Sequence, residues 1–433
     1  MQQNGILHSM TPSIRSSDIE VQPTSGRSAS GAAAARLIAF YLPQFHPIPE
    51  NDLWWGRGFT EWTNVAKARP LFRGHYQPHI PADLGFYDLR LPETRAAQAA
   101  LARSSGIEGF CYWHYWFAGK RLLDRPFNDV LKSGEPDFPF CLGWANQTWS
   151  GTWHGAPNRV LMEQTYPGRE DYERHFYALI EAFHDPRYIR VRGKPVFMIF
   201  NPADLPRAVE FIELWQSLTR KNGLPGMHFV AHVSYKDQPF DYRADGYDAG
   251  IAADAFGVSC WSAWQRSLRW YSSRKSSGGA MRNLLLKTRA LARAASLGGN
   301  RVLRRLLSRP HVFEYAEAML YFLDHATAEP HSYPCVMPNW DHSPRTGNRA
   351  VILHNSTPEL FRAHLRQALD LVAVRHFEDR LVFVKSWNEW AEGNYLEPDL
   401  RFGHQYLDVV RDEVLGRPGC KPAESSKPEM SAA

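Results

Sequence analysis

Apolar runs typical of buried strands alternate with helix-like segments along most of this chain. Such alternation favours a parallel sheet with helical crossovers. At 433 residues, eight strand-like runs predict an α/β fold closed into a (β/α)8 TIM barrel. The predicted strands cover residues 36–42, 106–116, 138–146, 195–201, 228–233, 249–255, 333–341 and 381–387. The predicted helices cover residues 92–104, 169–183, 206–221, 358–374 and 404–414.

One basic stretch interrupts this alternation. Between Ala255 and Phe313 the sequence has twelve Lys and Arg residues and no Asp or Glu, although the whole chain carries a net charge of only +5. Helical spacing of Leu and Arg predicts a basic helical insertion, which can either lie on an anionic membrane surface or cover the barrel as a solvated hairpin. Nucleic acid is not an expected partner, because no known binding motif is present. The predicted divisions are a disordered tail at 1–34, a barrel at 35–416, the insertion at about 262–312 and a disordered tail at 417–433.

Cysteine usage and the N-terminal sequence predict where the protein is found. The five cysteines are odd in number and widely spaced, without a CxxC pair, so we expect reduced thiols rather than disulfides or structural zinc. The first thirty residues are polar and lack the apolar core of a secretory signal. No stretch reaches the roughly 18 apolar residues of a membrane span. We therefore expect a cytoplasmic protein, peripheral to the inner membrane if the insertion binds it.

Two carboxylates follow the last predicted strand. Glu389 and Glu392 stand where that strand ends, among Trp387, Trp390 and Tyr395. In a (β/α)8 barrel, catalytic residues gather at the C-terminal ends of the strands. Paired carboxylates among aromatic rings suit sugar chemistry, because one can hold a proton for a leaving oxygen while the other acts as base or nucleophile. We therefore predict Glu389 and Glu392 as catalytic residues.

Polar and aromatic residues also follow the other predicted strands, where substrate would bind. Most of them can equally cap the barrel core. Several histidines lie among them, but their spacing matches no zinc template, and we expect neither a metal nor another cofactor. The predicted substrate-binding residues are Tyr41, Gln44, His46, Glu61, Trp62, Tyr112, His114, Trp144, Asn146, Asn339, Asp341, Trp387, Asn388, Trp390 and Tyr395.

A set of motifs resembles one known family. Together they look like the WbsX-like family of glycosyltransferases of bacterial surface-polysaccharide clusters, which is similar to glycoside hydrolase family 99, the endo-α-mannosidases and mannanases. The motifs are FYLPQFH at 40–46, WWGRGFTEW at 54–62, FCYWHYW at 110–116, WAN at 144–146 and NEWAEG at 388–393.

The resemblance implies a barrel with retaining chemistry at an α-mannoside-like linkage. By position, it implies that Glu389 deprotonates the sugar 2-hydroxyl, which then attacks its own anomeric carbon. Glu392 would act as general acid and then as general base for water or an acceptor. This chain has Ala391 where the hydrolases usually have His, so the inner pocket is expected to hold a different sugar.

Three functions are consistent with the sequence. The first is a carbohydrate-active enzyme that cleaves or transfers a glycosidic linkage of an oligosaccharide or lipid-linked glycan during surface-polysaccharide assembly. The second is a glycosyltransferase that uses a nucleotide-sugar or lipid-linked donor, although no GxGxxG follows a strand and no Asp-x-Asp ends one. The third is a non-catalytic glycan-binding barrel. The sequence does not indicate an oligomeric state.

Overall fold

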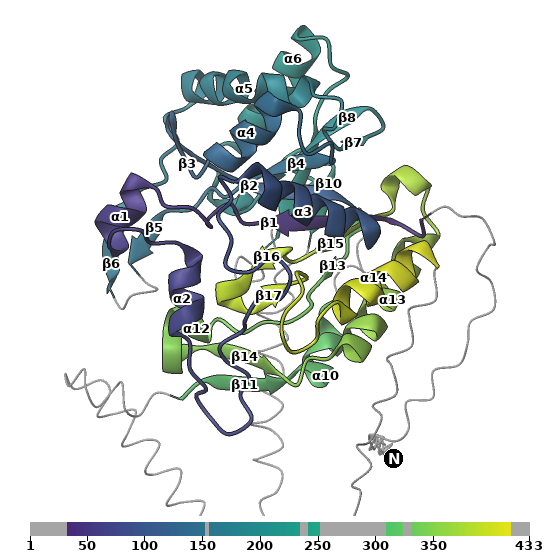
Figure 1. The fold of residues 1–433 in the computed structure, drawn as a ribbon. Coiled ribbons are helices and arrows are strands. Elements are labelled where there is room, and N and C mark those ends of the chain that lie inside the picture. Colours follow the sequence, from purple (N-terminus) through teal and green to yellow (C-terminus); the bar gives the residue numbers. More distant parts are fainter. Residues whose placement is uncertain (1–32, 152–155, 234–240, 252–308, 324–330, 417–433) are drawn as a thin grey trace, which may run out of the picture. The chain divides into compact units, whose positions relative to one another are not determined.

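The computed structural model describes residues 33–151, 156–233, 241–251, 309–323 and 331–416 (Figure 1). In this part of the chain, parallel strands form the predicted barrel, whose paired neighbours run in the order β12, β10, β9, β8, β4, β2, β1, β15 and β13. The predicted fold class is confirmed. The barrel strands are β1 (Arg36–Tyr41), β2 (Ile107–Phe117), β4 (Phe140–Trp144), β8 (Lys194–Ile199), β9 (His228–His232), β10 (Ala249–Ile251), β12 (Ser332–Tyr333), β13 (Cys335–Val336) and β15 (Leu381–Val384).

The seventh barrel position closes the ring in two short pieces. Strand β12 pairs with β10, whereas β13 pairs with β15 on the other side. Pro334 separates the two pieces because proline has no backbone N–H to donate to a ladder. Its carbonyl still accepts a hydrogen bond from the Phe383 backbone N–H of β15 at 2.9 Å. The predicted strand 333–341 was therefore too long, because the strand ends at Val336 and a loop follows.

Helices cover the barrel as predicted. In Figure 1, α13 and α14 lie side by side against one part of the barrel, and α5 packs with α6 at another. The helix α3 has the predicted bounds, the other four predicted helices differ from the prediction by one or two residues, and the helix α4 was not predicted. The longer helices are α3 (Pro92–Ser104), α4 (Arg125–Ser133), α5 (Arg169–His184), α6 (Ala208–Lys221), α13 (Pro358–Ala373) and α14 (Gln405–Leu415).

Bulky side chains fill the barrel interior. Phe40 of β1 stacks on Trp113 of β2 with ring centroids 4.8 Å apart, and on Phe383 of β15 at 5.5 Å. All three side chains are buried. Burying an aromatic side chain of this size contributes about 1.5–3 kcal/mol to folding, so these rings hold the strands at fixed positions beneath the site.

Short elements surround the C-terminal ends of the barrel strands. They lie in the loops that follow β1, β4, β13 and β15, which is where a barrel carries its active site. Other short strands pair at the edges of the barrel. The helical elements in these loops include α1 (Pro49–Trp55), α2 (Glu61–Lys67), α12 (Ser343–Thr346) and the 3-10 helix η6 (Trp390–Glu392), whereas α10 (Tyr315–Ala318) precedes β12. The strands are β3 (Lys120–Leu122), β5 (Trp149–Gly151), β6 (Ala156–Met162), β7 (Arg190–Val191), β11 (His311–Glu314), β14 (Val351–His354), β16 (Asn388–Glu389) and β17 (Asn394–Tyr395).

Most of the predicted insertion and tails lies outside the described residues. Of the insertion, residues 309–312 are described, and His311 and Val312 belong to strand β11 rather than to a helix. Of the predicted N-terminal tail, Ala33 and Ala34 are described, and the Ala34 N–H donates to the Val414 carbonyl at 2.8 Å. Among the described helices, none has the length and apolar character needed to cross a membrane.

Candidate active site

A cavity of about 630 Å³ lies at the C-terminal ends of the barrel strands. Residues from the loops after β1, β4, β8, β13 and β15, together with inward-facing residues of β2, line it. Its wall is rich in aromatic rings and amides, which suits the apolar faces and hydroxyl groups of sugars. The aromatic residues of the lining are Trp55, Phe59, Trp113, Tyr115, Trp149, Phe200 and Trp340.

Three carboxylates in this cavity share one guanidinium. Arg345 of α12 donates from Nε to Glu61 Oε2 at 3.2 Å and from Nη1 to Glu389 Oε1 at 3.4 Å. The same Nη1 donates to Glu392 Oε1 in the tightest of the three contacts. The Arg345 side chain is only 8% exposed, so the ion pairs are shielded from water. Loops after three different strands thus meet at one buried cation.

The protonation of this cluster follows from burial and from its charges. The pKa of Glu389 is raised to about 8, because burial and the neighbouring Glu392 outweigh the opposing effects of Arg345 and Lys385. Burial alone would lower the pKa of Arg345, but Glu61, Glu392 and Glu389 outweigh burial and hold it above its usual value. Arg345 is therefore charged, and the raised pKa of Glu389 favours its protonated form at neutral pH.

Local hydrogen bonds fix the loop that carries the two glutamates. The Asn388 side chain accepts from the Leu42 backbone N–H at 2.8 Å and donates to the Leu42 carbonyl at 3.1 Å. Ser386 Oγ accepts the backbone N–H groups of Asn388 at 3.1 Å and Glu389 at 2.9 Å. These bonds hold the end of β15 against the end of β1, so the position of Glu389 at the end of the barrel is fixed.

A close approach at Gly393 fixes the other side of Glu392. The Asp341 backbone N–H donates to the Glu392 carbonyl at 2.6 Å. Gly393 has a φ of +60°, and a Cβ at this position would lie 2.9 Å from Asp341 Cβ. Both the backbone angle and the space therefore require glycine. The loop that carries Glu392 consequently packs directly on the loop that leads to Arg345.

Four predicted site residues line the cavity. They are the proposed catalytic pair, Glu389 and Glu392, together with Glu61 and Gln44. Glu61 is the first residue of α2 and is 4% exposed. The sequence suggested no partner for it, and the structure shows that its partner is Arg345, 284 residues away.

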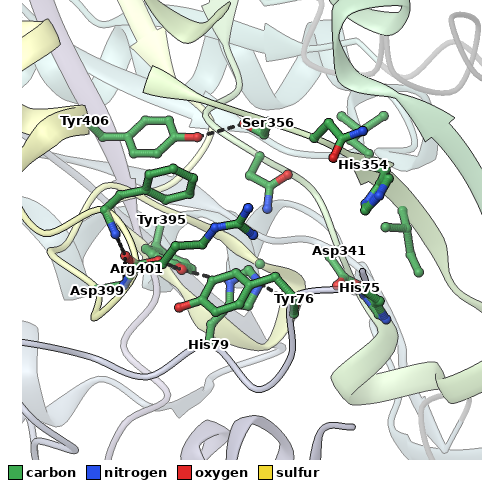
Figure 2. Close-up of a pocket in the computed structure, with 16 residues that line it drawn as sticks. His75, Tyr76, His79, Asp341, His354, Ser356, Tyr395, Asp399, Arg401 and Tyr406 are labelled. Atoms are coloured by element: carbon green, nitrogen blue, oxygen red, sulfur yellow. Dashed lines mark hydrogen bonds and ion pairs between the residues drawn. The ribbon is translucent and has the colours of Figure 1, made fainter. Parts of the chain in front are cut away.

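Three further predicted residues, Asn339, Asp341 and Tyr395, line a separate and smaller pocket of about 50 Å³. Figure 2 shows Asp341 beside His75 on one side of this pocket and Tyr395 near Asp399 on the other. Asp341 Oδ2 lies 2.7 Å from His75 Nε2 and accepts from Gln77 Nε2 at 2.7 Å. Burial would raise the pKa of Asp341, but these hydrogen bonds outweigh it and hold the pKa below its usual value. Asp341 thus fixes the loop after β13 through its contacts with His75 and Gln77.

Five of the other predicted residues pack on the outer side of the barrel strands or in its loops, away from the cavity lining. Tyr41 donates to Gln98 Oε1 of α3 at 2.7 Å, and Tyr112 packs against Tyr41 and against Phe127 of α4. The remaining three contact α5 or a loop. His114 Nε2 lies 2.9 Å from His175 Nε2, the Trp144 ring packs edge-on to His175, and Asn146 Nδ2 donates to the Asn201 carbonyl.

The last five predicted residues are also buried outside the cavity lining. Trp390 Nε1 donates to Glu397 at 2.6 Å, and its ring stacks on Tyr395 at 3.8 Å. Three more have packing or anchoring contacts: Trp62 donates from Nε1 to the Tyr87 carbonyl, Trp387 packs against Phe110, and Asn388 holds Leu42 as described. His46 is 2% exposed, and burial lowers its pKa.

Sequence reasoning missed several residues of the cavity wall. Trp113 and Tyr115 line the cavity, although the prediction chose their neighbours Tyr112 and His114 on the same strand. The alternation of side chains along a strand separates the two sets, but both faces of β2 are apolar, so its sequence does not show which face is inward. In the sequence, only the position of Arg345 after the seventh predicted strand indicates that it could belong to the site. Across the described ranges, no group of three or more His, Cys, Asp or Glu residues has an arrangement that could hold a metal ion.

Comparisons with known proteins agree with the fold. The uncharacterized protein WxcX of Xanthomonas campestris pv. campestris (strain B100) is 34% identical over 417 residues, which are 95% of this chain and 54% of that protein. The chain therefore spans about half the length of the curated relatives it matches. A solved structure described as a glycoside hydrolase-like protein shares the fold, with a TM-score of 0.51 at 13% identity over 90% of this chain and 96% of that one.

A GH99 endo-alpha-mannosidase from Bacteroides thetaiotaomicron aligns with 87% of this chain and 95% of its own at 14% identity, with a TM-score of 0.47. A family model, described as Glycosyltransferase WbsX, matches residues 37–410. That match includes every residue of the carboxylate cluster and all eight positions of the barrel. The chain belongs to the glycosyltransferase WbsX family.

Proposed function

We propose that the chain cleaves or transfers an α-mannoside-like glycosidic linkage with retention of configuration, using Glu389 and Glu392. The observation that carries this proposal is the carboxylate cluster on Arg345, inside an aromatic-lined cavity at the C-terminal ends of the barrel strands. Two carboxyls that differ in protonation are what glycoside chemistry requires. The substrate would be an oligosaccharide or lipid-linked glycan of a bacterial surface polysaccharide.

The proposed reaction has two steps. In the first, Glu389 takes the proton of the sugar 2-hydroxyl, whose oxygen bonds to the anomeric carbon to form a 1,2-anhydro sugar. Glu392 gives its proton to the leaving oxygen as the glycosidic bond breaks. In the second, water or an acceptor hydroxyl gives its proton to Glu392 and bonds to the anomeric carbon. The anhydro ring opens, and its 2-oxygen regains a proton from Glu389, so both glutamates return to their starting state.

The resting cluster places a requirement on this cycle. Without substrate, the raised pKa of Glu389 favours its protonated form, and Arg345 makes its tightest contact with Glu392. The first step instead needs an ionised Glu389 and a proton on Glu392. We propose that the leaving oxygen, on approaching Glu392, loosens its contact with Arg345 and draws the single shared proton to Glu392. Arg345 then pairs with Glu389 and Glu61, which it already contacts at 3.4 and 3.2 Å.

Transfer to an acceptor is a second candidate function, favoured by the glycosyltransferase description of the matching family. Hydrolysis and transfer share the anhydro intermediate, so the structure of the cluster suits both. The products of the wild-type enzyme distinguish hydrolysis from transfer. With an acceptor glycan present, an enzyme that transfers gives a lengthened product, whereas an enzyme that hydrolyses gives a free reducing end.

The test is product analysis by mass spectrometry. Purified protein is incubated with a panel of α-mannosides and lipid-linked bacterial glycans, alongside Glu392→Gln and the control Glu170→Gln, which alters an exposed carboxylate on α5. We expect product from the wild type and the control and none from Glu392→Gln. Binding without product in all three proteins would instead indicate a glycan-binding barrel, and equal turnover by Glu392→Gln would refute its role as the acid.

We also propose that the basic stretch binds anionic membrane, which would keep a cytoplasmic enzyme beside lipid-linked substrates at the inner membrane. Its support is the sequence alone, with twelve Lys and Arg residues and no acid between Ala255 and Phe313. Deletion of residues 266–309 is expected to reduce sedimentation with anionic liposomes while leaving binding to neutral liposomes unchanged. Equal sedimentation of the two proteins with anionic liposomes would contradict the proposal.

A further inference from the structure

A second large cavity lies at the opposite end of the barrel from the carboxylate cluster. Its volume is about 640 Å³, close to that of the candidate active site. Its lining comes from the N-terminal starts of β8, β9 and β10, from β12, and from the loop after α13. None of its lining residues is shared with the candidate active site. It is therefore a separate site in a size range typical of small-molecule pockets.

The lining of this cavity is basic. Four cationic residues, Arg192, Lys194, Arg243 and Arg375, face two carboxylates. Both carboxylates already have partners, because Arg192 Nη2 donates to Asp379 Oδ2 at 2.5 Å and Lys194 Nζ lies 3.7 Å from Asp248 Oδ1. Three histidines also line the cavity, and burial lowers the pKa of one of them, His228, to about 4, so that ring is neutral. The cavity consequently has more positive than negative charge before any ligand enters.

Two of the guanidinium groups have no acceptor. In the part of the chain that the structure describes, the side chains of Arg243 and Arg375 make no hydrogen bond and no ion pair. Arg375 is half-buried, and its pKa is lowered because the effect of burial outweighs the opposing effects of Asp379 and the nearby tyrosines. A guanidinium has five N–H donors in a planar fork that matches the oxygens of a phosphate. Arg243 is exposed and Arg375 is half-buried, so both guanidinium groups of the cavity are open to an anionic ligand that enters from solvent.

The other residues of the lining suit a ligand that carries hydroxyl groups as well as an anionic group. Asp248, Asp379 and the ring nitrogen of His228 can exchange hydrogen bonds with hydroxyl groups, while the rings of Tyr247 and Tyr333 add aromatic surface. A bare phosphate would leave most of the volume empty. We propose that this cavity binds a small phosphorylated sugar, with its phosphate on Arg243 and Arg375 and its hydroxyl groups toward the two aspartates. This site is independent of the glycoside chemistry proposed above.

Isothermal titration calorimetry at fixed ionic strength tests the proposal with four probes: glucose 1-phosphate, inorganic phosphate, inorganic sulfate and glucose. We expect saturable binding of glucose 1-phosphate, weaker binding of phosphate and sulfate, and no binding of glucose. Arg375→Gln and Arg243→Gln should each weaken glucose 1-phosphate binding by roughly ten- to a hundredfold, since a hydrogen bond to a charged group contributes about 1.5–3 kcal/mol. Arg220→Gln, on the exposed face of α6, is the matched control and should bind as the wild type does.

Several outcomes would overturn the proposal. Unchanged affinity in both arginine variants would place the anion elsewhere, and equal affinity for phosphate and glucose 1-phosphate would remove the sugar from the ligand. Absence of saturation with every probe would reject the site. Melting temperatures close to that of the wild type establish that the variants are folded, and Glu392→Gln should bind glucose 1-phosphate normally, which separates this site from the candidate active site.

Discussion

Strand β2 has two faces with different functions. Trp113 and Tyr115 point inward and line the cavity that holds the carboxylate cluster, whereas Tyr112 and His114 point outward and pack on α4 and α5. All four side chains are buried and all carry rings. The difference shows that burial and residue type do not distinguish a substrate wall from a packing layer in a barrel whose strands are covered on both sides. Inward position is what separates the two.

The largest effect is expected from an inward carboxyl. Glu392→Gln keeps the size of the side chain but removes the proton exchange, and general acid–base catalysis contributes about 10²- to 10⁴-fold to rate. We therefore expect kcat to fall by at least about 10²-fold with little change in Tm. A comparable loss of kcat from an outward substitution such as Tyr112→Phe would remove the distinction between the faces.

The second effect concerns the cation at the centre of the cluster. Arg345→Gln leaves three buried carboxyls without their shared counter-charge, and breaking a buried ion pair costs roughly 3–5 kcal/mol of unfolding free energy. The loss should be greatest above pH 8 and smaller near pH 5, where the carboxyls can take up protons. Denaturant unfolding at both pH values measures it. Arg345→Lys keeps the charge and should lose less, and equal losses in the two variants would show that shape rather than charge matters.

The third effect is a pH dependence of stability. The pKa of Glu389 is raised from 4.5 to about 8, so its protonated form is favoured in the folded state. That contribution to stability is fully present below pH 4.5 and is lost as the pH rises through about 8. Glu389→Gln cannot ionise, so relative to the wild type it should gain stability between pH 5 and pH 9. Thermal unfolding across this range checks the sign, and parallel curves for the two proteins would contradict the raised pKa.

The smallest expected effect compares the inward and outward faces of β2 directly. Tyr115→Phe and Tyr112→Phe each remove one hydroxyl from the same strand, one on the inward face and one on the outward face. A hydrogen bond contributes about 0.5–1.5 kcal/mol, so we expect Tyr115→Phe to lower kcat/KM by roughly 2- to 13-fold. Tyr112→Phe should leave kcat/KM unchanged. Equal kcat/KM values for the two variants would show that the inward hydroxyl does not contact the substrate.

The sequence predicted the barrel because strand and helix periods alternate along it, and it predicted Glu389 and Glu392 because they follow the last strand. The inward face of each strand could not be predicted in the same way. Tyr41, Tyr112 and Trp144 were chosen as aromatic residues near strand ends, yet their side chains lie in the layer between strands and helices. In a one-sided sheet, polar residues mark the outward face. Here helices cover the outer face and aromatic rings fill the inner one, so polar residues do not distinguish the two faces of a strand.

The carboxylate cluster could be predicted only in part, because it depends on contacts between distant loops. Glu61 and Arg345 are separated by 284 residues, and nothing local in either segment indicates their ion pair. Pro334 explains why strand seven is divided into β12 and β13, since a proline within a strand interrupts its ladder. The predicted substrate roles of the buried residues remain predictions, and those of Gln44 and Glu61 gain support from their place in the cavity lining.

The close approach of Gly393 to Asp341 has a consequence for how this site can vary. Glu392 and Arg345 come from loops after different strands, and the missing side chain at position 393 lets those loops touch. A saturation mutagenesis library across residues 388–397 should therefore tolerate substitution at position 393 as poorly as at the two glutamates, although glycine performs no chemistry. The distance between the acid and its counter-ion therefore depends on a hydrogen atom in place of a side chain at position 393.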